Sequence, residues 1–246
     1  MSKTEASVEE LITQIERGEL RLPEMQRRYV WRATRVRDLM DSLYRGYPSG
    51  AILVWESDNE VPQREFAVSQ AKNPYGTNKL LLDGQQRLTS LSALIRGEPV
   101  NVRGRKRPID ILFNLEHPDI VTFVTEVNED NGDDTQDDDH DHGDDTVDAS
   151  EDELQKRFSQ MTFVVASKRL AQVPHWVSVT EVFKSDSDGP ILQKAGLTGF
   201  DDPRYNKYSE RLKQLRSIKK YLYTTHILER KHSAQRHLQD NVLDLP

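Results

Sequence analysis

Residues 80–91 read Leu80-Leu81-Leu82-Asp83-Gly84-Gln85-Gln86-Arg87-Leu88-Thr89-Ser90-Leu91. An apolar run typical of a strand meets a glycine and continues directly into a segment typical of a helix. Gly84 permits a tight turn, and the first free N–H groups of the helix carry the positive end of its dipole. Arg87 adds a guanidinium fork that can pair with two phosphate oxygens. The stretch therefore predicts a phosphate-binding corner between a strand and a helix.

The acidic residue of this corner has two possible roles. Asp83, at the strand end, is a candidate to hold a metal ion or to orient a water molecule. The alternative is an ordinary connection in which Asp83 caps the helix and Arg87 is a solvated side chain. These few residues leave both interpretations open.

The composition indicates one soluble core. The chain has 246 residues, of which 35% are hydrophobic, so it can bury one sizeable core with a helical appendage. It has no long apolar run and no secretory pattern at its start, so we expect a cytoplasmic protein that does not contact the membrane. The absence of cysteine excludes disulfides, thiolate nucleophiles and cysteine-based zinc sites.

The charge is unevenly distributed. The net charge is −7, but the segment 128–153 contains fourteen Asp and Glu residues and no Lys or Arg. The remaining 27 acidic residues face 34 Lys and Arg, so the rest of the chain is basic, which is compatible with a nucleotide or nucleic-acid partner. We expect the acidic segment to be disordered. The segment does not match an EF-hand calcium loop that starts at Asp137. His142 stands at the position of the required glycine, and Asp148 stands at the position of the bidentate glutamate.

Hydrophobic periodicity predicts an α+β protein. Residues 20–25 contain Pro23, which suggests an edge strand or a loop. A short amphipathic element is predicted at 177–183, and no regular element is predicted for the last twenty residues. Helices are predicted at 7–17, between Thr34 as N-cap and Gly46, from Gly84 to Gly97, and at 208–223. Strands are predicted at 51–55, 79–82, 109–115, 120–127 and 161–166.

A basic and aromatic cluster follows the first expected strand. Arginines for phosphate pairing and aromatic rings for stacking are a combination typical of nucleic-acid binding. The alternative is that the aromatic residues are core anchors and the arginines face water. The cluster contains Arg21, Arg27, Arg28, Arg32, Arg35 and Arg37 with Tyr29 and Trp31, and the DNA-binding candidates are Arg28, Tyr29, Trp31, Arg32 and Arg35.

Four motifs occur in one order along the N-terminal part of the chain. They are Leu22-Pro23-x-x-Gln26-Arg27-x-Tyr29-Val30-Trp31, Asp41-Ser42-x-x-Arg45-Gly46-x-Pro48, Ile52-Leu53-Val54-Trp55 and Leu82-Asp83-Gly84-Gln85-Gln86-Arg87-Leu88-Thr89. Together they resemble the N-terminal domain of GmrSD-type restriction endonucleases, well over 8–97 and loosely over 98–223. The resemblance implies a ParB/sulfiredoxin-like fold, a small mixed sheet with flanking helices, followed by a helical C-terminal part.

The resemblance also implies site residues and cofactors. The implied cofactors are a nucleoside triphosphate and Mg²⁺, with Asp83 as metal ligand. Catalytic roles fall on Asp83, Gln86 and Arg87. Nucleotide-binding roles fall on Gly84, Gln85, Gln86, Arg87, Thr89, Gln26 and Arg27.

The chain departs from the family pattern in three places. The later Phe-x-x-x-Asn-x-x-Gly-type segment that usually completes the domain is not visible. Met25 stands where the family usually has Phe, a tolerable apolar exchange. The C-terminal His-Asn-His nuclease domain is absent, so we expect a shortened or split member with a nucleotide-binding core at 1–127, an acidic insertion at 128–153 and the remainder of the core with a helical segment at 154–246.

The expected function follows from these parts. It is a nucleotide-binding regulatory module of a DNA restriction or phage-defence system, with nucleotide hydrolysis as a further step, acting on a nuclease subunit or a missing C-terminal half. The alternatives are a non-enzymatic DNA-binding module and an inactive remnant.

Overall fold

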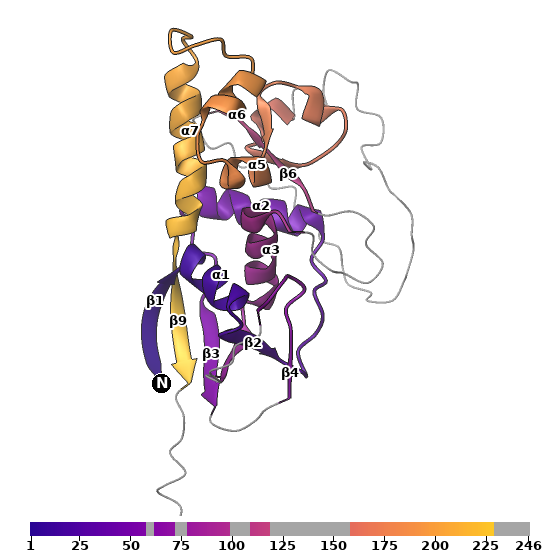
Figure 1. Ribbon diagram of the computed structural model, residues 1–246, viewed down its shortest axis with the longest axis vertical. Coiled ribbons are helices and arrows are strands. Elements are labelled where there is room, and N and C mark those ends of the chain that lie inside the picture. The colour runs from indigo at the N-terminus through magenta and orange to yellow at the C-terminus, as the bar shows by residue number, and fades with distance from the viewer. Residues whose placement is uncertain (58–61, 72–77, 99–108, 119–157, 229–246) are drawn as a thin grey trace, which may run out of the picture.

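A mixed six-stranded sheet forms the base of the protein in the computed structural model, which describes residues 1–57, 62–71, 78–98, 109–118 and 158–228 (Figure 1). Its strand order is β1-β9-β3-β5-β2-β4. The pairs β2–β5 and β3–β9 are parallel and the other pairs are antiparallel. The strands are β1 (Ser2–Ser7), β9 (Leu222–Leu228), β3 (Ile52–Ser57), β5 (Asn78–Asp83), β2 (Leu20–Pro23) and β4 (Gln63–Arg64).

Helices α1 (Val8–Glu16) and α3 (Gln85–Arg96) pack against each other and contribute to the core beside this sheet. A capping box starts α1, in which the Ser7 hydroxyl accepts from the Glu10 N–H and Glu10 accepts from the Ser7 N–H. The apolar face of α1 is fully buried, and Arg96 of α3 pairs with two glutamates of α1. The position of α3, which carries the predicted corner, is therefore fixed by both packing and charge.

A second layer lies on the far side of α2 (Ala33–Tyr44), which crosses the middle of the molecule (Figure 1). Tyr44 of α2 packs against Phe113 and Phe163 of a three-stranded sheet of order β7-β6-β8. The elements of this layer are β6 (Ile111–Asn114), β7 (Phe163–Val165), β8 (Trp176–Ser178), α5 (Val179–Lys184), α6 (Gly189–Lys194), α7 (Tyr205–Ser217) and two 3₁₀ turns, Leu170–Gln172 and Ile218–Lys220.

The α+β class is confirmed, and most of the predicted elements are present. The predicted helix over 208–223 is wrong at its end, because α7 stops at Ser217 and Leu222–Leu228 forms β9. This strand pairs with β1 and β3, and only its first two residues, Leu222 and Tyr223, lie in the predicted helix. Residues from both sides of the acidic segment therefore form one sheet. Strand β1 had no predicted counterpart.

The start of α2 and the position of β2 in the sheet also differ from the predictions. Helix α2 begins at Ala33 with Arg32 at the N-cap position, so Thr34 is not the cap. Strand β2 lies inside the sheet between β5 and the two-residue β4, with Pro23 as its last residue, where its missing N–H costs least.

Three expectations fall outside the described residues, namely the strand at 120–127, the acidic segment at 128–153 and the end of the chain after 228. Within the described ranges, none of the helices combines the length and the apolar character that a membrane crossing requires.

Candidate functional site

The predicted corner is present at the junction of β5 and α3. Gly84 has φ +102°, and it occupies the N-cap position of α3. A Cβ atom at this position would lie 2.4 Å from Cδ1 of Ile52, so the backbone approaches β3 as only glycine allows. No side chain caps α3, which means that Asp83 does not play the capping role of the alternative interpretation. The first-turn N–H groups of α3 therefore remain as donors at the positive end of the helix dipole.

A cleft of about 280 Å³ opens at this helix start. It joins the loop between β2 and α2 to the corner itself, and it is predominantly polar. Its lining residues are Gln26, Arg27, Trp31, Leu82, Asp83, Gly84, Gln85, Gln86 and Arg87. The structure thus brings together most of the residues that the sequence assigned to nucleotide binding. Thr89 is the exception, because it is fully buried in the core and does not line the cleft.

The Arg87 guanidinium is anchored to the neighbouring loop. Its Nη1 donates to the Ser49 carbonyl, and its Nη2 donates to the Ala51 carbonyl at 2.8 Å and to Asp83 Oδ2 at 3.0 Å. Its side chain is only 14% exposed. Arg87 therefore contributes positive charge to the cleft from a fixed position, and it holds the turn around Gly50 at the same time.

Asp83 is the exposed acid of the corner. Its side chain is 71% exposed, and its carboxylate at the end of β5 pairs with Arg87 of α3. No group of three or more His, Asp or Glu side chains suited to a metal ion occurs in the described part of the chain. A single accessible carboxylate fits a Mg²⁺ ion that arrives on phosphate oxygens, because such ions commonly use one or two carboxylates.

The two glutamines of the motif differ sharply in their surroundings. Gln86 Oε1 accepts from the backbone N–H groups of Val30 at 2.9 Å and Trp31 at 3.2 Å, and its Nε2 donates to the Arg28 carbonyl at 3.1 Å. Its amide is thus used in holding the β2–α2 loop. The structure places this predicted catalytic residue at the cleft wall, with its side chain directed to the protein backbone.

Gln85 has the opposite character. Gln85 is only 6% exposed, and it lines the cleft. Its side-chain amide has no hydrogen-bond partner among the described residues. Buried amides are normally satisfied, and an unused one in a polar cleft is available to a ligand or a water molecule. Gln85 is therefore the side chain of the motif best placed to contact a bound molecule.

The β2–α2 loop is attached to the corner by further contacts. Gln26 Nε2 donates to the carbonyls of Leu81 at 2.8 Å and Leu82 at 2.7 Å, which fixes Gln26 beside the end of β5. Tyr29 is 3% exposed, and its hydroxyl lies 2.8 Å from Ser90 Oγ of α3. Tyr29 is thus a core residue that cannot offer its ring to a base, and Trp31 packs partly against the core.

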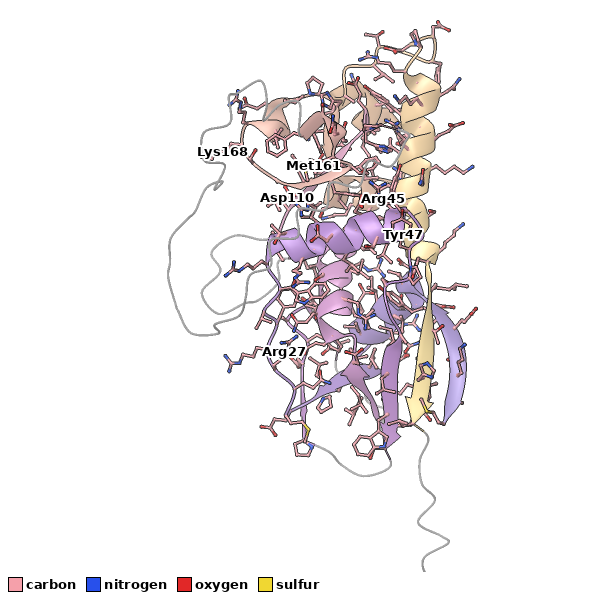
Figure 2. All side chains as sticks on the ribbon, turned by 180° about the vertical axis from the view of Figure 1, so that it is seen from behind. Arg27, Arg45, Tyr47, Asp110, Met161 and Lys168 are labelled. Carbon is pink, nitrogen blue, oxygen red and sulfur yellow. The ribbon has the colours of Figure 1, made fainter. Side chains whose placement is uncertain are left out.

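The predicted DNA-binding arginines lie on the outside of this loop and of the first turn of α2. Arg28, Arg32 and Arg35 are exposed, and none of them forms an ion pair with the described residues. We call these three residues the arginine face. Arg27 is also exposed, on the sheet side of α2, away from Asp110 and Met161 of the second layer (Figure 2).

The backbone partners of the site were not predicted from the sequence. The carbonyls of Ser49 and Ala51 anchor Arg87 from a turn more than thirty residues away in the chain. Backbone acceptors leave no mark in the side-chain pattern, so no local signal identified them. The glycine at position 50 is the one related feature of the sequence in this turn. The structure explains this glycine, because a Cβ atom there would lie 2.6 Å from Arg87 Nη1.

Comparison with known proteins agrees with this site. The chain matches the family described as the N-terminal domain of GmrSD restriction endonuclease over residues 8–241. An uncharacterized protein of Methanocaldococcus jannaschii is 30% identical over 113 residues, which cover 43% of this chain and 20% of that protein. The match to this relative therefore spans about a fifth of its length. Since the family match covers nearly the whole chain and includes the corner and the cleft, the protein belongs to the family of GmrSD restriction endonuclease N-terminal domains.

Proposed function

We propose that this protein is a nucleotide-binding module of a DNA restriction or phage-defence system, and that the nucleotide phosphates bind at the start of α3. The observation that carries the proposal is the uncapped α3 N-terminus facing a polar cleft that is lined by Gln85, whose side-chain amide has no hydrogen-bond partner among the described residues. Backbone donors and the helix dipole favour anions at this position. Membership of the restriction family supports the biological setting.

The same groups are suited to hydrolysis of the terminal phosphate. In that reaction a water oxygen attacks the γ-phosphorus while the bond to the leaving diphosphate breaks. The α3 N–H groups and Arg87 stabilise the charge on the phosphate oxygens, and Gln85 orients the water in place of Gln86, whose amide is engaged. A Mg²⁺ ion held by Asp83 and the phosphates would neutralise further charge.

Three finer assignments accompany this proposal. We assign the chain to the ParB/sulfiredoxin-like fold, because a small mixed sheet presents a phosphate corner at a strand-to-helix junction. We place its action in the cytoplasm, where restriction acts on incoming DNA. We also propose that it regulates a nuclease subunit or a nuclease half, since nucleotide binding would serve to control cleavage elsewhere.

DNA is the second proposed ligand. The arginine face presents three guanidinium groups without acidic partners among the described residues, an arrangement that favours contacts with the phosphate backbone. A backbone binder loses affinity steeply as salt rises and responds little to nucleotide. A nucleotide-gated module responds to both, so a salt series with and without nucleotide distinguishes the two functions.

The nucleotide proposal is tested by thermal stabilisation with ATP, GTP, CTP and UTP, each with and without Mg²⁺. A ligand at about 100 times its dissociation constant adds about 2.7 kcal/mol of stability. The decisive variant is Gln85→Glu, which preserves size but places a carboxylate beside the phosphates. Gln85 has no hydrogen-bond partner in the described structure and an acid suits the first turn of a helix, whereas burial of the new carboxylate lowers stability. The nucleotide shift of the variant is therefore measured from its own melting temperature without nucleotide.

We expect Gln85→Glu to abolish the shift that the wild type shows with at least one nucleotide. The matched control is Gln193→Glu, which makes the same chemical change at an exposed position of α6 and should preserve the shift. Equal stabilisation of wild type and Gln85→Glu would remove the phosphates from this corner. The absence of a shift with every nucleotide in the wild type would contradict the proposed function itself.

A further inference from the structure

Gln86 connects the start of α3 to the β2–α2 loop. It is the second residue of α3, so its backbone belongs to the first turn, where the proposed phosphate site lies. Its side chain is 7% exposed and bonds to the β2–α2 loop, which also lines the cleft. Gln86 therefore links the backbone of the first turn of α3 to this loop through its own side-chain hydrogen bonds.

The loop segment that Gln86 holds supports the arginine face. The amide of Gln86 bonds the carbonyl of Arg28 and the N–H groups of Val30 and Trp31. The next residue, Arg32, occupies the N-cap position of α2, and its carbonyl accepts from the Arg35 N–H at 3.1 Å. The three hydrogen bonds of Gln86 thus fix the backbone from which the arginine face projects.

Two other attachments limit how far the loop can move. Gln26 binds the end of β5, and Tyr29 binds Ser90 in the second turn of α3. Ser90 Oγ in turn donates to the Gln86 carbonyl at 2.7 Å. With the loop held at both sides, ordering of the α3 first turn by a bound phosphate restricts the backbone between residues 28 and 31. A more restricted arginine face loses less conformational entropy when it binds DNA.

We propose that Gln86 is a positioning residue that couples nucleotide binding at the corner to DNA binding at the arginine face. The inference rests on the proposed function, because it requires a nucleotide at the start of α3. The coupling is reciprocal, so DNA also tightens nucleotide binding by the same factor. We expect nucleotide to tighten DNA binding by about 5-fold or more, within the usual range for coupled sites.

The test measures the affinity for a short fluorescein-labelled DNA duplex by anisotropy at fixed salt. It is performed without nucleotide and with a saturating, non-hydrolysable triphosphate that stabilises the wild type. The variant Gln86→Met keeps the length of the side chain and removes its three hydrogen bonds. The coupling factor is the ratio of the DNA affinities of one protein with and without nucleotide, so a change in the variant's affinity for either ligand alone does not affect it. We expect this factor to fall to about 1 in the variant.

The chain offers a closely matched control. Gln70 also uses its amide to hold backbone, accepting from the Phe66 N–H and donating to the carbonyls of Ile15 and Leu20. Gln70→Met therefore removes three similar bonds away from the cleft, and it should lower stability while the coupling factor stays at the wild-type value. A general loss of rigidity would change both variants alike.

Hydrogen exchange provides a second readout that needs no variant. The N–H groups of Val30 and Trp31 are bonded to Gln86, so we expect their exchange to slow when nucleotide binds. Unchanged exchange at these amides would overturn the inference, as would an undiminished coupling factor in folded Gln86→Met. Uncoupled binding of both ligands to wild type would also overturn it, while the proposed nucleotide function would stand. Failure of wild type to bind nucleotide would instead remove the proposed function and this inference together.

Discussion

Replacement of Arg87 by alanine should destabilise the protein as well as weaken nucleotide binding. The guanidinium donates to the carbonyls of Ser49 and Ala51 and to Asp83, and it lies 5.8 Å from the ring centre of Tyr223. Hydrogen bonds to charged groups contribute roughly 1.5–3 kcal/mol each, and water recovers part of this when the side chain is removed.

The magnitude follows from these contacts. Asp83 is 71% exposed, so its ion pair with Arg87 adds at most about 1 kcal/mol. The two carbonyl contacts dominate, and we expect Arg87→Ala to lower the free energy of unfolding by about 3 kcal/mol. For a domain of this size that corresponds to a decrease in Tm of roughly 6–12 °C. Arg87→Lys keeps the charge but not the two-pronged geometry, so it should lose about half as much.

Urea unfolding followed by tryptophan fluorescence provides the measurement. Arg35→Ala is the matched control, because Arg35 is exposed and has no ion-pair partner among the described residues, and it should change stability by less than about 0.5 kcal/mol. If Arg87→Ala is as stable as this control, the reasoning that Arg87 anchors the turn at Ser49 and Ala51 is refuted.

Two further predictions concern the backbone at the corner and the response to pH. Gly84→Ala should lower the free energy of unfolding by about 2 kcal/mol, because an L-residue is strained at φ +102° and its Cβ would press on Ile52. The control is Gly189→Ala, which has open space around it and should leave the stability unchanged in the same melting experiment. Burial and a hydrogen bond to Glu116 raise the pKa of the Tyr208 hydroxyl from 10 to about 12. The unfolded chain therefore loses this proton first, and stability should decline as the pH rises from 10 to 12, by about 2 kcal/mol at the upper end. Tyr208→Phe should lack this component of the alkaline decline, and an identical decline in both proteins would contradict the assignment.

Local patterns in the sequence were sufficient for the corner itself. The apolar run of β5, the glycine and the amphipathic pattern of α3 lie within one continuous stretch, so short-range rules located the turn and the helix start correctly. The family resemblance was carried by four such stretches and is confirmed by the match over nearly the whole chain.

Long-range pairing decided what the sequence could not show. No strand is predicted over Leu222–Leu228, and this segment forms β9 because β1 and β3 supply partners on both sides. The division of roles between the two glutamines has the same origin. Gln85 and Gln86 are chemically identical neighbours, and only the position of the β2–α2 loop, more than fifty residues away in sequence, engages one and leaves the other available.

Calorimetric titration of the protein with a triphosphate and with the corresponding nucleoside shows whether the phosphates, rather than the base, bind at the start of α3. We expect the nucleoside triphosphate that stabilises the protein to bind with one-to-one stoichiometry. The nucleoside without phosphates should bind at least about 100-fold more weakly, a difference of about 2.8 kcal/mol. Equal affinities for the two compounds, or no binding of any triphosphate, would contradict the claim that this corner is a phosphate site.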